Sequence, residues 1–473
     1  MTTSDDWETV IGLEVHVELA TESKLFSSAP NRFGEDPNTC IDPVVLGLPG
    51  SLPVLNERAI ELSIRTGLAL GCQVQPCVFA RKNYFYPDMP KDYQISQYDR
   101  PLNVDGRLEL ADGSVVGIER AHLEEDTGKS THVGGGGRIH DAEYSLVDYN
   151  LAGVPLLEIV SRPDIRSAEQ ARAYVEELQA IVVAIGASDG RLEEGSMRVD
   201  ANVSVRPVGS DELRTRCEIK NVNSLRSLVR AIEHEAARHV DLWSHGEAPR
   251  QETRHWDEQA GRTTPGRSKE EAEDYRYFAE PDLVPVEPDP AWIDEIRAAL
   301  PALPAARRSR LVDELGADPG DAALLVQRDL DTLVAEAAAA GAPADRVLTR
   351  AVHNLADVDP GALSADHLAE LVSMEADGSL TATQAKQVLA DMVESGRSPA
   401  DLAAERGFEA MDSGDLEAIV DAAIAEHPDD WSKFCAGEDK VMGFFVGQVM
   451  KATQGNADGK VVSALLRERR TQR

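Results

Sequence analysis

Carboxylate and imidazole side chains alternate with apolar residues in the segment from Val10 to Leu19. Because successive side chains of an extended strand point to opposite faces, one face would be aliphatic and the other would carry Glu14, His16 and Glu18. Such groups can bind a divalent cation or exchange protons with a substrate. In a single strand, however, a polar face that simply meets solvent is the more common meaning of this pattern.

Three other segments also place acidic or polar side chains along a predicted strand. Residues 197–206 and 216–220 alternate in the same way, and residues 122–130 contain three consecutive acids that cannot all point to one side of a strand. The polar members are Arg198, Asp200, Asn202, Ser204, Arg206, Arg216, Glu218, Lys220, Glu124, Glu125 and Asp126. Several acidic faces in one region predict a single concave polar cradle.

Crowded carboxylates repel one another, and a divalent cation neutralises them effectively. Oxygen ligands with one imidazole suit Mg²⁺ or Mn²⁺, while zinc also binds histidine together with acids. These residues alone therefore favour a cation site over a solvated sheet and leave the metal open.

The elements that must position these side chains lie in the first part of the 473 residues. Short alternating strands, turns and a few helices extend to about residue 290, and proline-rich residues 281–304 separate them from an Ala- and Leu-rich helical part. We expect an α+β chain: a cradle domain of mixed or antiparallel sheet with packed helices at 1–293, a helical domain at 294–398 and a small helical tail domain at 399–473.

Composition narrows the class of protein. Hydrophobic residues make up 42% of the chain and no apolar run is long enough to span a membrane. Five cysteines without CxxC spacing and an acidic N-terminus fit a cytoplasmic protein without disulfides. The net charge of -35 means that any nucleic acid must meet a locally basic patch. The tail offers one, made of Lys451, Lys460, Arg467, Arg469 and Arg470, although solvated terminal arginines explain it equally well.

Two other patterns imitate known sites. Gly128-Lys129-Ser130 lacks the first glycine of a phosphate-binding loop, and the histidines of His234-Glu235 and His239 are five residues apart rather than four. Neither is predicted to be functional. The chain also lacks a cysteine in a glutaminase-like setting and a Gly/Ser-rich amidase segment.

Long ordered blocks of this sequence resemble the B subunits of tRNA-dependent amidotransferases. The blocks are residues 8–16, 81–88, 122–126, 148–160, 251–254, 274–278 and 443–452. The absence of an aspartyl-tRNA-synthetase-like insertion favours the bacterial aspartyl/glutamyl-tRNA(Asn/Gln) type over its archaeal relative. Leu151 stands where the family usually has arginine, so the phosphate or tRNA contact of that arginine is not carried over to this chain.

The resemblance implies a chemistry and its cofactors. The side-chain carboxylate of Glu-tRNA(Gln) or Asp-tRNA(Asn) would be phosphorylated with ATP and Mg²⁺ (or Mn²⁺), and ammonia would then displace phosphate to give Gln-tRNA(Gln) or Asn-tRNA(Asn). Phosphoryl transfer depends mainly on positioning and charge neutralisation. Ammonia would come from an amidase (A) subunit, with a small C subunit as the third component.

The resemblance also implies roles for particular residues. The metal-ligand candidates are Glu14, His16, Glu125 and Asp200, with Glu124 added to the catalytic set. The candidates for contacts with ATP or substrate are Lys82, Asp148, Asn150, Glu158, Arg198, Asn202, Ser204, Glu218 and Lys220. The basic tail residues would contact tRNA.

Two rival functions are open from the sequence. One is a tRNA-binding scaffold with an inert cradle, which the clustered charge argues against. The other is a zinc hydrolase that acts alone, which metal analysis and a chelator would separate from an ATP-dependent enzyme.

Overall fold

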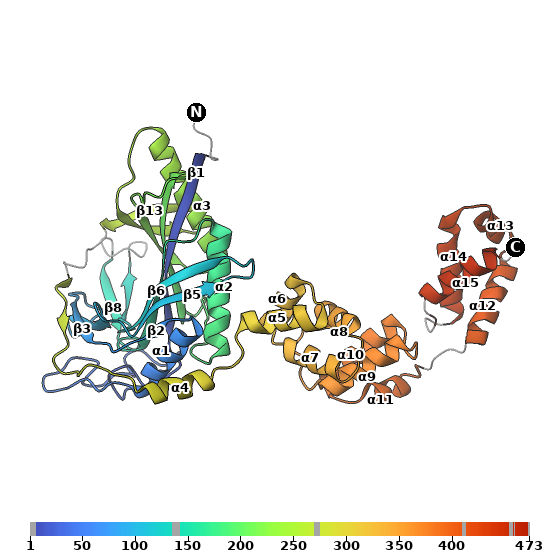
Figure 1. Cartoon of the computed structure of the whole chain (residues 1–473), viewed down its shortest axis with the longest axis horizontal. Helices are drawn as coiled ribbons and strands as arrows, with labels where there is room; N and C mark the ends of the chain where they lie inside the picture. Colours follow the sequence, from blue (N-terminus) through green and yellow to red (C-terminus); the bar gives the residue numbers. More distant parts are fainter. Residues whose placement is uncertain are drawn as a thin grey trace. The chain divides into compact units, whose positions relative to one another are not determined.

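The structure is a computed structural model that describes residues 6–134, 142–268, 275–408, 413–453, 457 and 459–471. The chain divides into two compact units, Met1–Ala305 and Ala306–Arg473. The first unit contains every described strand and the second is helical (Figure 1). This confirms the α+β fold class predicted from the sequence.

A twelve-stranded sheet forms the body of the first unit, with the order β13-β12-β11-β10-β1-β9-β6-β4-β3-β14, while β5 pairs with β6 and β2 with β5. Neighbouring strands are antiparallel except β11 and β12. The bounds are β1 Trp7–Glu18, β2 Gln73–Val74, β3 Phe79–Asn83, β4 Tyr93–Gln97, β5 Asn103–Glu109, β6 Val115–Glu125, β9 Pro155–Ser161, β10 Met197–Pro207, β11 Cys217–Val222, β12 Glu252–Asp257, β13 Arg262–Ser268 and β14 Phe278–Ala279.

One face of this sheet is the core of the unit. The aliphatic residues of β1 that alternation assigned to one side, Ile11, Leu13, Val15 and Val17, are all fully buried. They share a core with the apolar faces of helices α1 (Glu57–Ala69), α2 (Ala168–Ala184) and α3 (Leu225–Ser244). Each helix begins at a side-chain cap, provided by Asn56, Ser167 and Ser224 respectively. Because the helices cover the apolar face, the other face is left for polar chemistry.

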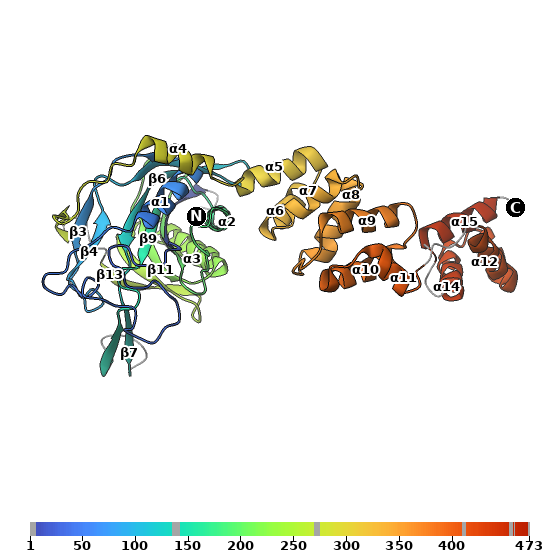
Figure 2. The ribbon, with the colours of Figure 1, turned by 90° about the horizontal axis from the view of Figure 1, so that it is seen from below.

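Two smaller elements complete the unit. Helix α4 (Pro290–Ala298) packs near α1, and Ile296 contributes to the same core. Strands β7 (Lys129–Val133) and β8 (Tyr144–Asp148) form a separate two-stranded hairpin that projects away from the large sheet (Figure 2).

The second unit contains two apolar clusters, one formed by residues between Leu311 and Ala403 and the other by residues between Leu416 and Leu466. Helix α5 (Pro304–Leu315) begins at the boundary between the units. The other α-helices are α6 Pro319–Gln327, α7 Asp331–Ala339, α8 Ala344–Arg350, α9 Ala365–Ala376, α10 Ala382–Ser395, α11 Pro399–Glu405, α12 Ser413–Glu426, α13 Pro428–Cys435, α14 Met442–Ala452 and α15 Gly459–Thr471. The domain limits at 293/294 and 398/399 stay predictions. Within the described residues, no helix is both long enough and apolar enough to cross a membrane.

Candidate functional site

The polar face of the large sheet carries charged side chains from five adjacent strands. Strand pairing places Glu14 opposite Asp200, and His16 opposite Glu158. It also places Glu158 opposite His122, and Asn202 opposite Glu218. Since directly paired residues point to the same side of a sheet, residues distant in the sequence meet in one polar layer.

The first group of potential ligands joins β1, β6 and β9. His16 Nε2 lies 3.5 Å from Glu124 Oε1 and 3.6 Å from Glu158 Oε2. His122 Nε2 lies 3.3 Å from Glu158 Oε2, and the Ser96 hydroxyl donates to Glu124 Oε2 at 3.4 Å. One nitrogen of His16 and one oxygen of each glutamate fall within 4.8 Å of one another, as metal ligation requires.

The electrostatics of this group show that it requires positive charge. Burial is the largest influence on His16 and lowers its pKa, but the contacts and charges of Glu124 and Glu158 outweigh burial and raise the pKa to about 10. Burial also opposes ionisation of the glutamates, yet the two histidines hold the pKa of Glu158 well below its usual range, and His16 lowers that of Glu124. The two carboxylates are therefore ionised and hold a cationic partner between them.

The second group lies beside the first on the same face of the sheet and joins β1, β10 and β11. Glu14, Asp200 and Glu218 place one carboxylate oxygen each within 4.8 Å of one another. Lys220 Nζ lies 2.8 Å from Asp200 Oδ2 and 3.5 Å from Glu218 Oε1. Asn202 donates to Glu14 Oε1 at 2.9 Å. A lysine therefore already supplies positive charge to this group.

The predicted metal ligands do not form one cluster. His16 belongs to the first group, and Glu14 and Asp200 belong to the second. Glu125 belongs to neither, because its carboxylate accepts hydrogen bonds from Lys91 Nζ at 2.6 and 2.7 Å and from the backbone N–H of Ile95 at 3.0 Å. Its role as a metal ligand stays a prediction.

The other predicted substrate residues surround the two groups or support nearby loops. Arg198 Nη2 lies 2.9 Å from Asp126 Oδ2, and Lys82 Nζ lies 4.7 Å from the ring centroid of Tyr275. Ser204 is buried and donates to a carbonyl oxygen of β1 at 3.4 Å.

Asp148 and Asn150 hold the loop at residues 36–40. Asp148 Oδ1 accepts from the backbone N–H of Asn38 at 3.0 Å, and Asn150 Oδ1 accepts from that of Cys40 at 2.8 Å. Their contacts within the chain are those of residues that fix a loop, and a substrate contact stays a prediction.

Reasoning from the sequence missed His122 as a member of the first group. The signal was present, because His122 and Glu124 are two residues apart on one strand and must share a face. Lys91 was missed for a different reason. It lies in a loop, and nothing in its sequence neighbourhood identifies Glu125 as its partner.

The predicted tRNA-binding residues of the tail differ in their contacts. Lys451, Lys460 and Arg467 are exposed. Arg469 pairs with Glu417 and Asp421, at 2.8 Å in both cases, and Arg470 pairs with Asp439. The paired arginines join helices of the tail, so their charge is partly satisfied within the chain.

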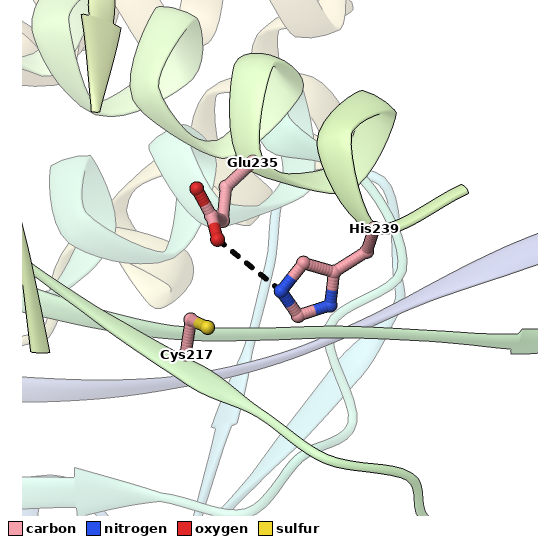
Figure 3. Close-up of side chains that lie close together, drawn as sticks. All are labelled: Cys217, Glu235 and His239. Carbon is pink, nitrogen blue, oxygen red and sulfur yellow. Dashed lines mark ion pairs between the residues drawn. The ribbon is translucent and has the colours of Figure 1, made fainter. Parts of the chain in front are cut away.

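A third group lies on the opposite, helix-covered face of the sheet. Glu235 and His239 come from α3 and Cys217 from β11, and all three are buried (Figure 3). His239 Nε2 lies 3.2 Å from Glu235 Oε1, but the same glutamate also accepts from Arg238 and from Thr263. Since these donors satisfy Glu235 without a metal, the group is a polar network that joins α3 to the sheet.

Comparison with known proteins adds the family to this geometry. Residues 9–294 match the model of the GatB/GatE catalytic domain, which contains both acid groups of the polar face, and residues 333–469 match the GatB domain. The chain is 48% identical to the B subunit of the aspartyl/glutamyl-tRNA(Asn/Gln) amidotransferase of Moorella thermoacetica, over 98% of the chain and 100% of that protein. It is 48% identical to the protein of the same name from Thermobifida fusca, over 98% and 94%. The corresponding Corynebacterium glutamicum protein is 47% identical, over 98% of each. The chain therefore belongs to the GatB/GatE family, as its resemblance predicted.

Proposed function

We propose that the chain is the subunit of an aminoacyl-tRNA amidotransferase that activates a tRNA-bound carboxylate with ATP. The substrates are Glu-tRNA(Gln) and Asp-tRNA(Asn), and the site of action is the cytoplasm, where aminoacyl-tRNA is used. The observation that carries this proposal is the pair of acid groups on one sheet face, within the region that matches the family's catalytic domain.

A side-chain carboxylate does not react with ammonia at neutral pH, because its leaving group would be oxide. Its oxygen therefore first attacks the γ-phosphorus of ATP, the bond to the bridging oxygen breaks, and ADP leaves. Ammonia then attacks the acyl carbon, phosphate departs, and an amide remains. Ammonia is supplied by an amidase partner, which a small C subunit joins to this chain.

The first acid group fits Mg²⁺ as the ion that accompanies ATP. Its ligands would be two ionised carboxylates and the imidazole of His16, which must release its proton to bind an ion. Mg²⁺ is bound through one or two carboxylates together with waters and phosphate oxygens. His16, Glu124 and Glu158 would hold the ion, which supplies charge neutralisation for the phosphates. Lys82, Lys220 and Arg198 contribute fixed positive charge, and Asn202 orients Glu14 by its hydrogen bond.

The test is amide formation by the assembled complex. Glu158→Gln and Glu124→Gln remove one charge each from the first group and are expected to lower ATP-dependent amidation of Glu-tRNA(Gln) about 100-fold or more, the scale of a lost transition-state contact. Glutamine hydrolysis by the partner subunit should persist. Glu119→Gln, on the same strand β6 but with a side chain 57% exposed, is the matched control.

Unchanged amidation in both variants would overturn the assignment of the site. Zinc also accepts a histidine with two carboxylates, so the metal content of the purified chain decides between this proposal and a zinc hydrolase. Hydrolysis by the isolated chain that requires zinc and no ATP would favour the hydrolase.

A further inference from the structure

Aromatic rings gather beside the polar face where β4, β3 and β14 meet. The rings of Tyr98 and Tyr277 are stacked, with centroids 4.2 Å apart and planes inclined by 6°. Tyr275 meets Tyr277 edge-on, with centroids 6.1 Å apart. The activation chemistry proposed above uses none of these rings.

The backbone that carries two of the tyrosines is fixed in a strained conformation. Asn83 Nδ2 donates to the carbonyl oxygens of Tyr275 and Arg276 at 2.8 and 2.9 Å. Arg276 has a φ of 46°, in the left-handed region that side-chain-bearing residues avoid. Asn83 therefore fixes the backbone between Tyr275 and Tyr277, and with it the positions of both rings.

The aromatic rings adjoin the acid groups. Ser96 on β4 donates to Glu124, and Tyr98 follows two residues later, directly after the end of the strand. Burial and the nearby charges of Glu124 and Glu158 raise the pKa of the Tyr277 phenol, which is therefore neutral.

A lysine lies close to both the rings and the acids. Lys82 Nζ is 4.7 Å from the Tyr275 ring centroid, and its charge lowers the pKa of Glu124, after the larger effects of burial and of the neighbouring acid and histidine. Lys82 and the acid groups, which suit phosphates and their cation, thus lie next to tyrosine rings, which suit a flat ligand.

Tyr98 presents a preformed flat surface to solvent. The residue is 50% exposed, although its ring is backed by a second, parallel ring. The backing fixes the orientation of Tyr98, so a ligand ring would gain stacking without first ordering the side chain. A flat π-system attached to phosphates is the chemistry that matches both halves of this surface, and nucleotide bases are bound in this way by aromatic side chains.

We propose that Tyr98, backed by Tyr277, is the stacking platform for the adenine base of a nucleotide whose phosphates lie toward Lys82 and the acid groups. This inference rests on the proposed function, which provides two sources of adenine: ATP and the 3′-terminal adenosine of the tRNA. The platform recognises the same chemistry in both.

The first experiment measures binding of ATP with MgCl₂ to the assembled complex by titration calorimetry. Base–aromatic stacking predicts that Tyr98→Ala weakens ATP binding about 5- to 100-fold, whereas Tyr98→Phe keeps the ring and stays within about 2-fold of wild type. Tyr98→Leu retains apolar volume without a π-face and should resemble the alanine variant. Tyr144→Ala, at another exposed tyrosine (55%) on β8, is the control. Inorganic tripolyphosphate, which has no base, should bind all variants equally.

The second experiment compares tRNA with and without its 3′-terminal adenosine. Wild type should prefer the complete tRNA, and if the platform takes that adenosine, Tyr98→Ala loses the preference while its affinity for ATP stays unchanged. A defect in either experiment supports the platform and identifies the source of the base. If wild type binds ATP and complete tRNA, and Tyr98→Ala and Tyr98→Leu bind both equally well, the platform is refuted while the proposed function stands. Wild-type protein that binds neither ligand would refute the proposed function as well.

Discussion

The buried ion pair between Lys91 and Glu125 allows a direct test of the different roles of two adjacent acids on β6. Glu124 belongs to the acid groups of the polar face, whereas Glu125 is held by Lys91. The side chains are 6% and 4% exposed, with Nζ 2.6 Å from the nearer carboxylate oxygen. Lys91→Met removes the cation and leaves the Glu125 carboxylate buried with one backbone N–H donor, that of Ile95. Breaking a buried pair in this way costs about 3–5 kcal/mol, because the remaining charge is uncompensated.

The assay is urea unfolding followed by tryptophan fluorescence. Four of the five tryptophans lie in the first unit, so a Trp431→Phe background confines the signal to that unit. Arg172→Met is the matched control, since Arg172 and Glu176 form an exposed pair on α2, with side chains 49% and 39% exposed. Exposed helical pairs contribute about 0.3–0.5 kcal/mol.

Replacing both partners of the buried pair, as Lys91→Met with Glu125→Leu, should recover much of the loss, because two apolar side chains leave no charge to desolvate. If Lys91→Met costs no more than Arg172→Met, Glu125 is not held by Lys91, and its carboxylate would be available to the acid groups of the polar face.

Three further predictions concern other parts of the chain. Burial, the largest influence, raises the pKa of Glu235, but the contact with His239 and the hydrogen bonds from Arg238 and Thr263 outweigh burial and hold the pKa below its usual value of 4.5. The stability that Glu235 contributes is therefore present above about pH 4.5 and is lost as the pH falls below it. Urea midpoints between pH 7 and pH 3.5 should thus fall more steeply in wild type than in Glu235→Gln, and parallel curves would contradict this. Gly67→Ala should destabilise the first unit by about 1–3 kcal/mol, since the added Cβ would lie 2.0 Å from Oδ1 of the buried Asn103. Gly447→Ala on α14 has open space around the added Cβ and should not destabilise the protein. Unfolding midpoints that stay equal to that of wild type in both variants would refute the packing argument. Lys451→Ala combined with Arg467→Ala should weaken tRNA binding and flatten its dependence on salt. Arg469→Ala, which breaks two ion pairs, should instead lower the melting temperature of the tail. An unchanged salt slope of tRNA binding in the double variant would exclude this surface as the phosphate contact.

Alternation along single strands could be predicted from the sequence. The aliphatic residues of β1 and β10 lie in the core, and Glu14, His16, Asp200 and Asn202 lie on the polar face, because the side-chain period of a strand is local information. The helices that cover the sheet also begin at the polar caps that precede them. The physical basis in each case lies within a few residues of the position concerned.

The division of the acids into two groups could not be predicted, because it depends on strand pairing. Glu158 joins His16 only through the register between β9 and β1, and a shift of one residue would turn it to the other face. Glu124 and Glu125 are adjacent acids with opposite orientations, and only the pairing of β6 with its neighbours and the position of Lys91 determine which one meets the histidines. Contacts between distant segments are set by the whole fold.

The measurement that tests the central claim most directly is the anomalous scattering of Mn²⁺ in crystals of the complex soaked with MnCl₂ and ATP. We expect a manganese peak bound by His16, Glu124 and Glu158, and its loss in crystals of Glu158→Gln. Manganese bound elsewhere, with this group empty in the presence of nucleotide, would contradict the assignment of the first acid group as the cation site.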